Sequence, residues 1–124
     1  MNAFNPPPNF RYLDLKTATE NFGDDALLSE LLCLLHDRLS GDWAAFEKSF
    51  NEHQITPALE IIHSIKGTVP MFADKLTTSF ISLMEEKLRT KGLNDEVQEL
   101  FLSLQLRMQE FIVELGQWHA AQEP

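Results

Sequence analysis

The run "DDALLSELLCLLHDRL", residues 24–39, decides the fold class of this chain of 124 residues. Its leucines recur at intervals of three and four, which is the spacing of one face of an α-helix. The two acidic residues that open the run suit a helix N-terminus, where the helix dipole is positive. We therefore predict a helix whose inward face carries Leu28, Leu31, Leu32, Leu35 and Leu39.

This helix is expected to continue beyond the quoted run. The same register is kept by three aromatic residues, Trp43, Phe46 and Phe50. One helix is therefore predicted over about residues 24–53, bent at Gly41. The alternative is a break in the Ser-Gly-Asp sequence around that glycine, because serine and aspartate both cap helices.

A short helix and a third helix follow from their start and stop signals. The short helix covers residues 13–22, and Gly23 ends it. In "ITPAL", Thr56 is expected to be the N-cap and Pro57 the first helical residue, so that a helix begins there and reaches about Phe72.

Two more helices complete the chain. The first spans about residues 74–91 and ends at Gly92, with an inward face of Leu76, Phe80, Leu83, Met84 and Leu88. The second begins after Asn94 or Asp95 as its cap. Its apolar stripe consists of Val97, Leu100, Phe101, Leu104, Met108, Phe111, Ile112, Leu115 and Trp118.

These elements define the expected fold and its boundaries. No stretch of alternating polar and apolar residues indicates a strand. The predicted fold is all-α: an antiparallel up-and-down four-helix bundle over residues 13–118, with an additional short N-terminal helix. Residues 1–12, which include "NPPP", are expected to form an extended proline-rich arm, and residues 119–124 a frayed tail.

The composition excludes several classes of function. Charged residues make up 23% of the chain and hydrophobic residues 44%, as in a globular protein, and the net charge of −9 opposes binding to nucleic acid. No window approaches the roughly 18 uninterrupted apolar residues of a membrane span. The single cysteine, Cys33, cannot form an internal disulfide, and the first residues lack the pattern of a secretory signal. We therefore expect a cytoplasmic protein that binds neither nucleic acid nor membrane.

The segment "EIIHSIKGTVPMF", residues 60–72, carries the candidate functional residues. On a helical wheel of the whole helix that begins in "ITPAL", the core face holds Ala58, Ile62, Ile65, Val69 and Phe72. His63 lies roughly 140° from the centre of that face, together with Glu60 and Gly67. Lys66 follows three residues later, within side-chain reach of the histidine. His63 is therefore expected to be exposed in the middle of a helix.

A histidine on an exposed helix face is usually an ordinary surface residue, but two neighbours favour a more specific role. Gly67 costs ~1 kcal/mol relative to alanine inside a helix, and core packing does not explain it on an exposed face. Pro70 costs ~3 kcal/mol if the helix continues unbent, although it also fits a place where the helix bends or ends. Both indicate a surface that a partner approaches closely.

A histidine in this setting suits phosphoryl transfer. Near pH 7 an ordinary histidine ring is largely neutral, so it attacks phosphorus without a separate base. Lys66 is placed to bring positive charge to the phosphoryl oxygens, and Gly67 leaves clearance for the partner. No metal ligands or acid–base pair accompany His63 in the sequence. The metal ion and the acceptor carboxylate are therefore expected to come from the partner.

The motif "HSIKG", residues 63–67, resembles the H-x-[apolar]-K-G signature of histidine-containing phosphotransfer (HPt) domains. The resemblance includes the leucine-rich helix after "GDD" and the segment "LTTSFISLMEEKLRTKG", and it covers about residues 13–108. It implies a four-helix bundle in which His63 accepts and donates the phosphoryl group, Lys66 assists and Gly67 gives clearance. The chain departs from the family after the motif, where Pro70 and Ala73 stand at positions of glycines or small residues in many members, and Val69 and Met71 are bulkier than usual.

The resemblance also implies the partners. The protein would be a phosphoryl carrier without an ATP-binding kinase domain, rather than an enzyme in its own right. It would pass the phosphoryl group between aspartates on receiver domains of response regulators or hybrid sensor histidine kinases. It would need no cofactor of its own, because the receiver would supply Mg²⁺. We expect the local docking surface to include Glu60, Ser64, Pro70 and Met71.

Two other functions are compatible with the sequence. The first is a binding module that keeps the helical bundle and docks receiver domains or other signalling proteins without phosphotransfer. The second is a metal enzyme, since Glu60 and His63 form an E-x-x-H pair of the kind found in di-iron bundles. No second E-x-x-H pair is present, because none of the other three histidines has a glutamate three residues earlier. No metal site is therefore predicted.

Overall fold

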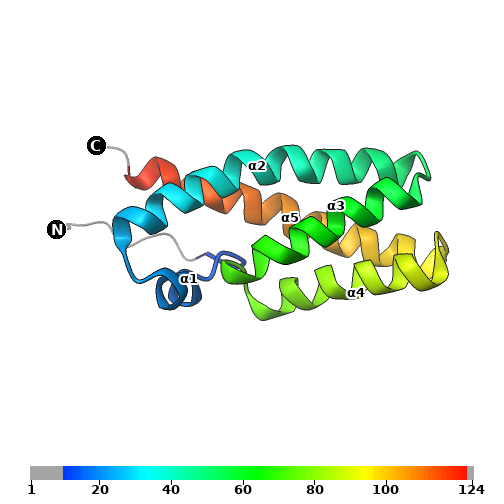
Figure 1. Ribbon diagram of the computed structural model, residues 1–124, viewed down its shortest axis with the longest axis horizontal. Coiled ribbons are helices and arrows are strands. Elements are labelled where there is room, and N and C mark those ends of the chain that lie inside the picture. The colour runs from blue at the N-terminus through cyan, green and yellow to red at the C-terminus, as the bar shows by residue number, and fades with distance from the viewer. Residues whose placement is uncertain (1–9, 123–124) are drawn as a thin grey trace.

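The computed structural model describes residues 10–122, and within that range the regular structure is entirely helical (Figure 1). The predicted all-α class is therefore confirmed. In chain order the elements are α1 (Leu15–Phe22), α2 (Asp25–Asn51), α3 (Ile55–Thr68), the 3₁₀ turn η1 (Val69–Met71), α4 (Lys75–Lys91) and α5 (Asp95–Gln122).

The four long helices lie side by side along the length of the molecule (Figure 1). They contact one another in a closed order, α2 with α3, α3 with α4, α4 with α5, and α5 with α2. The short helix α1 lies at one end, against α2 and η1. This arrangement is compatible with the predicted four-helix bundle and its additional N-terminal helix. It places α3 between α2 and α4.

Aspartate side chains cap the starts of the first two helices, and a glycine ends the first one. Asp14 begins α1, where its Oδ1 accepts a hydrogen bond from the Thr17 amide at 3.0 Å. Gly23 ends α1 in the left-handed region at φ 70°, which glycine adopts without strain. The Oδ1 of Asp24 then accepts the Leu27 amide at 3.0 Å and begins α2.

Helix α2 is continuous through Gly41, so the alternative of a break at that point is wrong. Leu39 and Trp43 are buried on either side of this exposed glycine. Their packing offsets the weak helix preference of one glycine, which costs only ~1 kcal/mol. The predicted core face is buried at Leu28, Leu32, Leu35, Leu39, Trp43, Phe46 and Phe50, while Leu31 is half-buried.

The predicted start of α3 is wrong by two residues. Gln54 takes the N-cap position without a side-chain hydrogen bond, and its carbonyl oxygen accepts the Ala58 amide at 3.1 Å. Thr56 therefore lies inside the helix and does not cap it. Pro57 also lies in the first turn, where backbone amides have no acceptor within the helix. The amide proton that proline lacks therefore costs no helical hydrogen bond there.

The α-helical part of α3 ends at Thr68, four residues before the predicted end at Phe72. Pro70 has no amide proton to donate to the carbonyl of Lys66, so the regular hydrogen-bond pattern stops there. The chain continues as the 3₁₀ turn η1, closed by the Phe72 amide on the Val69 carbonyl at 2.9 Å. The core face predicted for this segment is nevertheless buried at Ala58, Ile62, Ile65, Val69 and Phe72.

The predicted inward face of α4 is partly wrong. Met84 and Leu88 are buried as predicted and Phe80 is half-buried, but Leu76 and Leu83 are exposed. The buried residues of α4 are Thr77, Ile81, Met84, Glu85 and Leu88. The buried face of α4 therefore differs from the predicted one, and it includes a carboxylate.

Asn94, one of the two predicted caps, is the N-cap of α5, because its Oδ1 accepts the Val97 amide at 2.8 Å. The predicted stripe is buried at Val97, Phe101, Leu104, Met108, Phe111, Leu115 and Trp118, with Leu100 and Ile112 half-buried. The helix extends to Gln122, four residues beyond its expected end, where a frayed tail was predicted. Residues 123–124 of that tail, and residues 1–9 of the predicted N-terminal arm, lie outside the described residues.

The last residues of the predicted arm, and residues 13–14 of the predicted short helix, precede α1 and are packed against the rest of the chain. Tyr12 and Leu13 are buried, and an isolated antiparallel bridge pairs Leu13 with Ala73. The carboxylate of Glu114 accepts the backbone amides of residues 11, 12 and 13 at 2.8, 2.9 and 2.8 Å. This segment therefore joins α5 to the link between η1 and α4.

Candidate functional site

His63 lies in the middle of α3 and is exposed, as the helical wheel predicts. Its side chain is 70% accessible, whereas Ile62 and Ile65 on either side are buried. The helix is therefore anchored by its core face and presents the imidazole outward. A ring in this position is accessible to a macromolecular partner.

One edge of the imidazole is held by a buried carboxylate on the neighbouring helix. Nδ1 of His63 lies 2.7 Å from Oε2 of Glu85, whose side chain is only 2% accessible. A carboxylate only accepts hydrogen bonds, so Nδ1 is the nitrogen that carries the proton in this contact. In the neutral ring this leaves the lone pair on Nε2.

Glu85 also binds two cations. Nζ of Lys66 lies 2.5 Å from Oε1, as an ion pair without the alignment of a hydrogen bond. The guanidinium of Arg89, one turn along α4, donates to Oε2 at 2.7 Å. One buried carboxylate thus connects His63, Lys66 and Arg89, which come from two helices.

The pKa of Glu85 reflects two opposing effects. Burial alone raises the pKa of this carboxyl, because it penalises the charged form. The Lys66 ammonium and the His63 ring lie against the carboxylate and outweigh burial, so the pKa of Glu85 lies below its ordinary value. Glu85 is therefore an ionised acceptor near neutral pH, which supports the assignment of the proton to Nδ1.

The other residues predicted around His63 lie on the same side of α3 or just beyond its end. Gly67 is exposed, and a Cβ atom placed on it would meet nothing within 4 Å. No contact within the described chain therefore requires a glycine there. Of the predicted docking residues, Glu60, Ser64 and Met71 are exposed and Pro70, in η1, is half-buried.

Glu85 and Arg89 were not predicted as site residues. Their segment, "EEKLRTK", has five charged residues among seven, which is typical of a solvated helix face, and the predicted inward face of α4 consisted of apolar residues only: Leu76, Phe80, Leu83, Met84 and Leu88. A usable signal was nevertheless present. Glu85 follows Ile81 by four residues and precedes Leu88 by three, so it lies at a buried position of the stripe that the structure shows. An acidic residue at such a position needs a cationic or hydrogen-bonding partner.

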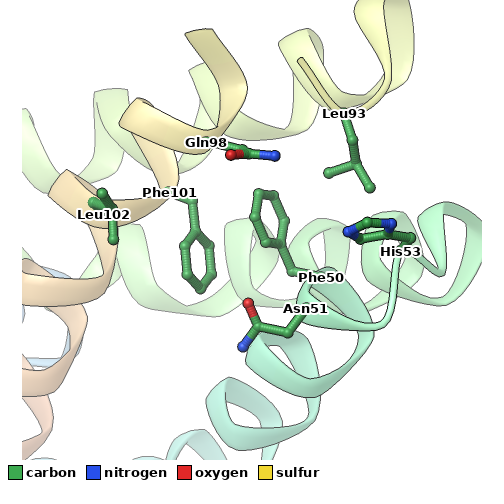
Figure 2. Close-up of a pocket in the computed structure, with 7 residues that line it drawn as sticks. All are labelled: Phe50, Asn51, His53, Leu93, Gln98, Phe101 and Leu102. Carbon is green, nitrogen blue, oxygen red and sulfur yellow. The ribbon is translucent and has the colours of Figure 1, made fainter. Parts of the chain in front are cut away.

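A pocket of about 310 Å³ lies elsewhere, at the end of the long helices remote from α1 (Figure 2). Its walls include the rings of Phe50 and Phe101, which stack with centroids 4.1 Å apart. His53 and Gln98 also line it. His63 does not line this pocket, so the candidate site is an open surface rather than a cavity.

Within the part of the chain that the structure describes, no group of three or more histidine, cysteine, aspartate or glutamate residues is placed to hold a metal ion. The E-x-x-H pair of Glu60 and His63 is exposed on α3. None of the helices within the described range combines the length and apolar character needed to span a bilayer.

Comparisons with known proteins add no assignment. No family model matches the chain, and neither a curated protein nor a solved structure matches it.

Proposed function

We propose that this protein is a histidine phosphotransfer protein of a two-component phosphorelay, in which His63 carries the phosphoryl group. The observation that carries the proposal is an exposed imidazole whose Nδ1 is bound by a buried, ionised glutamate, so that Nε2 remains available. Such a ring is a positioned nucleophile. The motif "HSIKG" supports the same function through its resemblance to HPt domains.

The proposed reaction needs little chemistry from this chain. The Nε2 lone pair of His63 attacks the phosphorus of a phosphoaspartate on a receiver domain, and a new N–P bond forms. The P–O bond to the aspartate breaks, and its electron pair leaves on the carboxylate. Transfer to a second receiver runs the same step in reverse. Mg²⁺ on the receiver would neutralise charge on the phosphoryl group, since this chain contributes no metal ligands to the proposal.

The neighbours of His63 have corresponding roles in the proposal. Lys66 and Arg89 bring two positive charges to the surface around His63, where both pair with the carboxylate of Glu85. That surface favours an approaching phosphoryl group. Gly67 provides clearance for the receiver, and Glu60, Ser64, Pro70 and Met71 provide the docking contacts.

We also infer that α2 to α5 form the antiparallel bundle that the resemblance implies. The closed order of helix contacts and the burial of one face of each long helix support this inference. A phosphoryl carrier between receiver domains and hybrid sensor kinases would act in the cytoplasm. It would have no kinase activity and no cofactor of its own.

The test is transfer of labelled phosphate from a panel of phosphorylated receiver domains to the wild-type protein and to His63→Gln. We expect label that is labile in acid and stable in alkali, on the wild type alone. His36→Gln is the control, because it removes a histidine on α2 and leaves the proposed site intact. Label on His63→Gln would exclude His63 as the carrier. A folded wild type that binds receivers and takes label from none of them would favour the binding module.

A further inference from the structure

The last helix, α5, carries an exposed stripe without charge. Between positions 102 and 118 its exposed residues are Leu102, Ser103, Leu106, Gln109, Val113 and Gln117, and none of them is charged. Three of them are large apolar residues: Leu102, Leu106 and Val113 are 62, 58 and 57% exposed. Apolar surface that continues over several turns of one helix is typical of an interaction site. We call Leu102, Leu106, Gln109 and Val113 the α5 stripe.

The exposed leucines of the other long helices are interrupted by charge. On α2, Leu34 is as exposed as Leu102, but Glu30 and Arg38 lie one turn before and one turn after it. On α4, Glu86 and Lys87 follow Leu83 after one turn. The α5 stripe is therefore a place where a second copy of this chain, whose net charge is −9, meets little local repulsion.

We propose that the α5 stripe is the interface of a homodimer, in which the α5 helices of two copies pack antiparallel about a two-fold axis between positions 107 and 108. The proposal concerns a surface remote from His63 and does not depend on the phosphotransfer function. Helix α5 contacts α2 and α4, so α3 lies across the bundle from it. Both copies would keep His63 exposed.

The spacing of the α5 stripe is the same in both directions. Its residues follow one another at intervals of four, three and four, as the contact positions of paired helices do. A two-fold axis requires that if one residue meets a second residue of the other copy, the second also meets the first. With the axis at this position, Leu102 faces Val113 of the other copy, and Leu106 faces Gln109.

Charge at the borders of the stripe favours the antiparallel direction over the parallel one. Parallel helices would place Glu99 and Glu110 beside the same carboxylates of the other copy, and like charges at an interface oppose association. In the antiparallel pair Glu99 faces Gly116 and Glu110 faces Gln105, which are uncharged. Antiparallel helices also bring opposite ends of their dipoles together.

The size of the stripe predicts how tightly the copies associate. Its exposed residues are far fewer than the roughly 20–30 on each side of a standard interface. We therefore expect a weak, reversible dimer with a dissociation constant between about 10 µM and about 1 mM. Added salt should increase the dimer fraction, because it screens the repulsion between two acidic chains and leaves the apolar contact in place.

The first test is sedimentation velocity of the full chain from about 10 µM to about 1 mM. We expect the wild type to shift from monomer toward dimer, and Leu106→Glu to stay monomeric with an unchanged circular dichroism spectrum. Leu34→Glu is the matched control, since it makes the same change at an equally exposed leucine of α2 and should dimerise like the wild type. A wild type that is monomeric throughout, or a dimer that Leu106→Glu leaves unchanged, would overturn the proposal.

The second test measures the direction of the helices by disulfide formation in a Cys33→Ser background. Leu102→Cys and Val113→Cys are oxidised separately and as a mixture. Antiparallel pairing predicts rapid cross-linking in the mixture, because the two positions face each other. It predicts slow cross-linking of each variant alone, since a residue 11 positions away along a helix is displaced by about 16 Å. Cross-linking of Leu102→Cys alone as fast as in the mixture would refute the antiparallel dimer.

Discussion

Nδ1 of His63 and Oε2 of Glu85 are 2.7 Å apart, although 22 residues separate them in sequence. The contact joins α3 to α4, so residues from both helices surround the exposed histidine. Lys66 reaches the same carboxylate from α3 and is paired with it. In the proposed function, an arriving phosphoryl group would compete with Glu85 for this ammonium.

The contribution of Glu85 to stability should depend on pH. Its pKa in the folded protein lies below the ordinary value of 4.5, because the ammonium of Lys66 and the ring of His63 outweigh the effect of burial. The unfolded chain therefore binds the proton more readily than the folded one. The stabilisation from ionised Glu85 is fully present above the pKa of the unfolded chain and is lost as pH falls through the lower folded pKa.

The measurement is urea unfolding of the wild type and of Glu85→Gln between about pH 6 and about pH 3. We expect the wild-type free energy of unfolding, relative to that of the variant, to decrease steadily toward acid pH. Glu86→Gln serves as the reference for a change of charge at an exposed position. A difference between wild type and Glu85→Gln that is constant over this range would contradict the assigned direction of the pKa shift.

Gly67 allows stability and function to be separated in one substitution. Its backbone is helical, and an added Cβ meets nothing within 4 Å. Gly67→Ala should therefore raise the free energy of unfolding by about 0.5–1 kcal/mol through helix preference. The proposed clearance role predicts the opposite effect on function, with slower transfer from receiver domains because the methyl group lies where the partner approaches.

Gly41 provides the matched control for this substitution. It lies inside α2, is exposed and also has nothing within 4 Å of an added Cβ. Gly41→Ala should stabilise the protein by a similar amount and leave transfer unchanged. If both alanine variants are stabilised and both transfer at the wild-type rate, Gly67 has no role in clearance.

The sequence predicts most of the helices because their signals are local. Asp24, Gly23 and Gly92 mark helix ends through capping and left-handed backbone, and both effects depend on a few neighbouring residues. The apolar spacing of α2 and α5 repeats over many turns, so a single misplaced residue does not change the predicted face. The exposure of His63 follows from the same periodicity.

The carboxylate contact was missed because it depends on packing between helices. The leucines at positions 76 and 83 have apolar side chains but lie on the exposed side of α4. The actual orientation of α4 is fixed by the helices on either side of it, α3 and α5. His63 and Lys66, both on α3, contact the buried carboxylate of Glu85. The spacing within α4 is compatible with a buried Glu85, but it does not identify these partners on another helix.

His53 should be a site of easy stabilisation. It is the residue after the C-cap of α2, and its backbone is in the left-handed region at φ 60°, the one non-glycine residue there among residues 10–122. A residue with a Cβ is strained in this conformation by about 1–2 kcal/mol. Glycine removes this strain, but its more flexible unfolded chain offsets part of the gain in stability. His53→Gly should therefore stabilise the protein by about 0.5–1 kcal/mol in urea unfolding.

The reverse substitution tests the same reasoning. Gly23 has φ 70° and open space around an added Cβ, so only the backbone opposes a side chain there. Gly23→Ala should lower the free energy of unfolding by about 1 kcal/mol. Opposite signs for the two variants are expected; destabilisation by both would show that the His53 ring contributes packing or polar contacts that outweigh its backbone strain.

The last prediction concerns the carboxylate that holds the N-terminal segment. Glu114 is buried and accepts three consecutive backbone amides, from Arg11, Tyr12 and Leu13. Removing the acceptor leaves these amides without their hydrogen-bond partner, and Tyr12 and Leu13 are buried. Glu114→Ala should therefore lower the free energy of unfolding by about 2 kcal/mol or more. Glu114→Gln keeps one accepting oxygen and should lose less.

Hydrogen exchange separates this local anchor from a general loss of stability. In Glu114→Ala, exchange should accelerate relative to the wild type at the amides of Tyr12 and Leu13, which donate to Glu114, and less at the amides of Ile62 and Ile65 in α3. Glu99→Ala, at an exposed position of the same helix, should change neither the stability nor the exchange. Equal acceleration at all four amides would mean that Glu114 stabilises the whole fold and not specifically the segment that precedes α1. Loss of a local contact would instead accelerate exchange mainly at the amides that donate to Glu114.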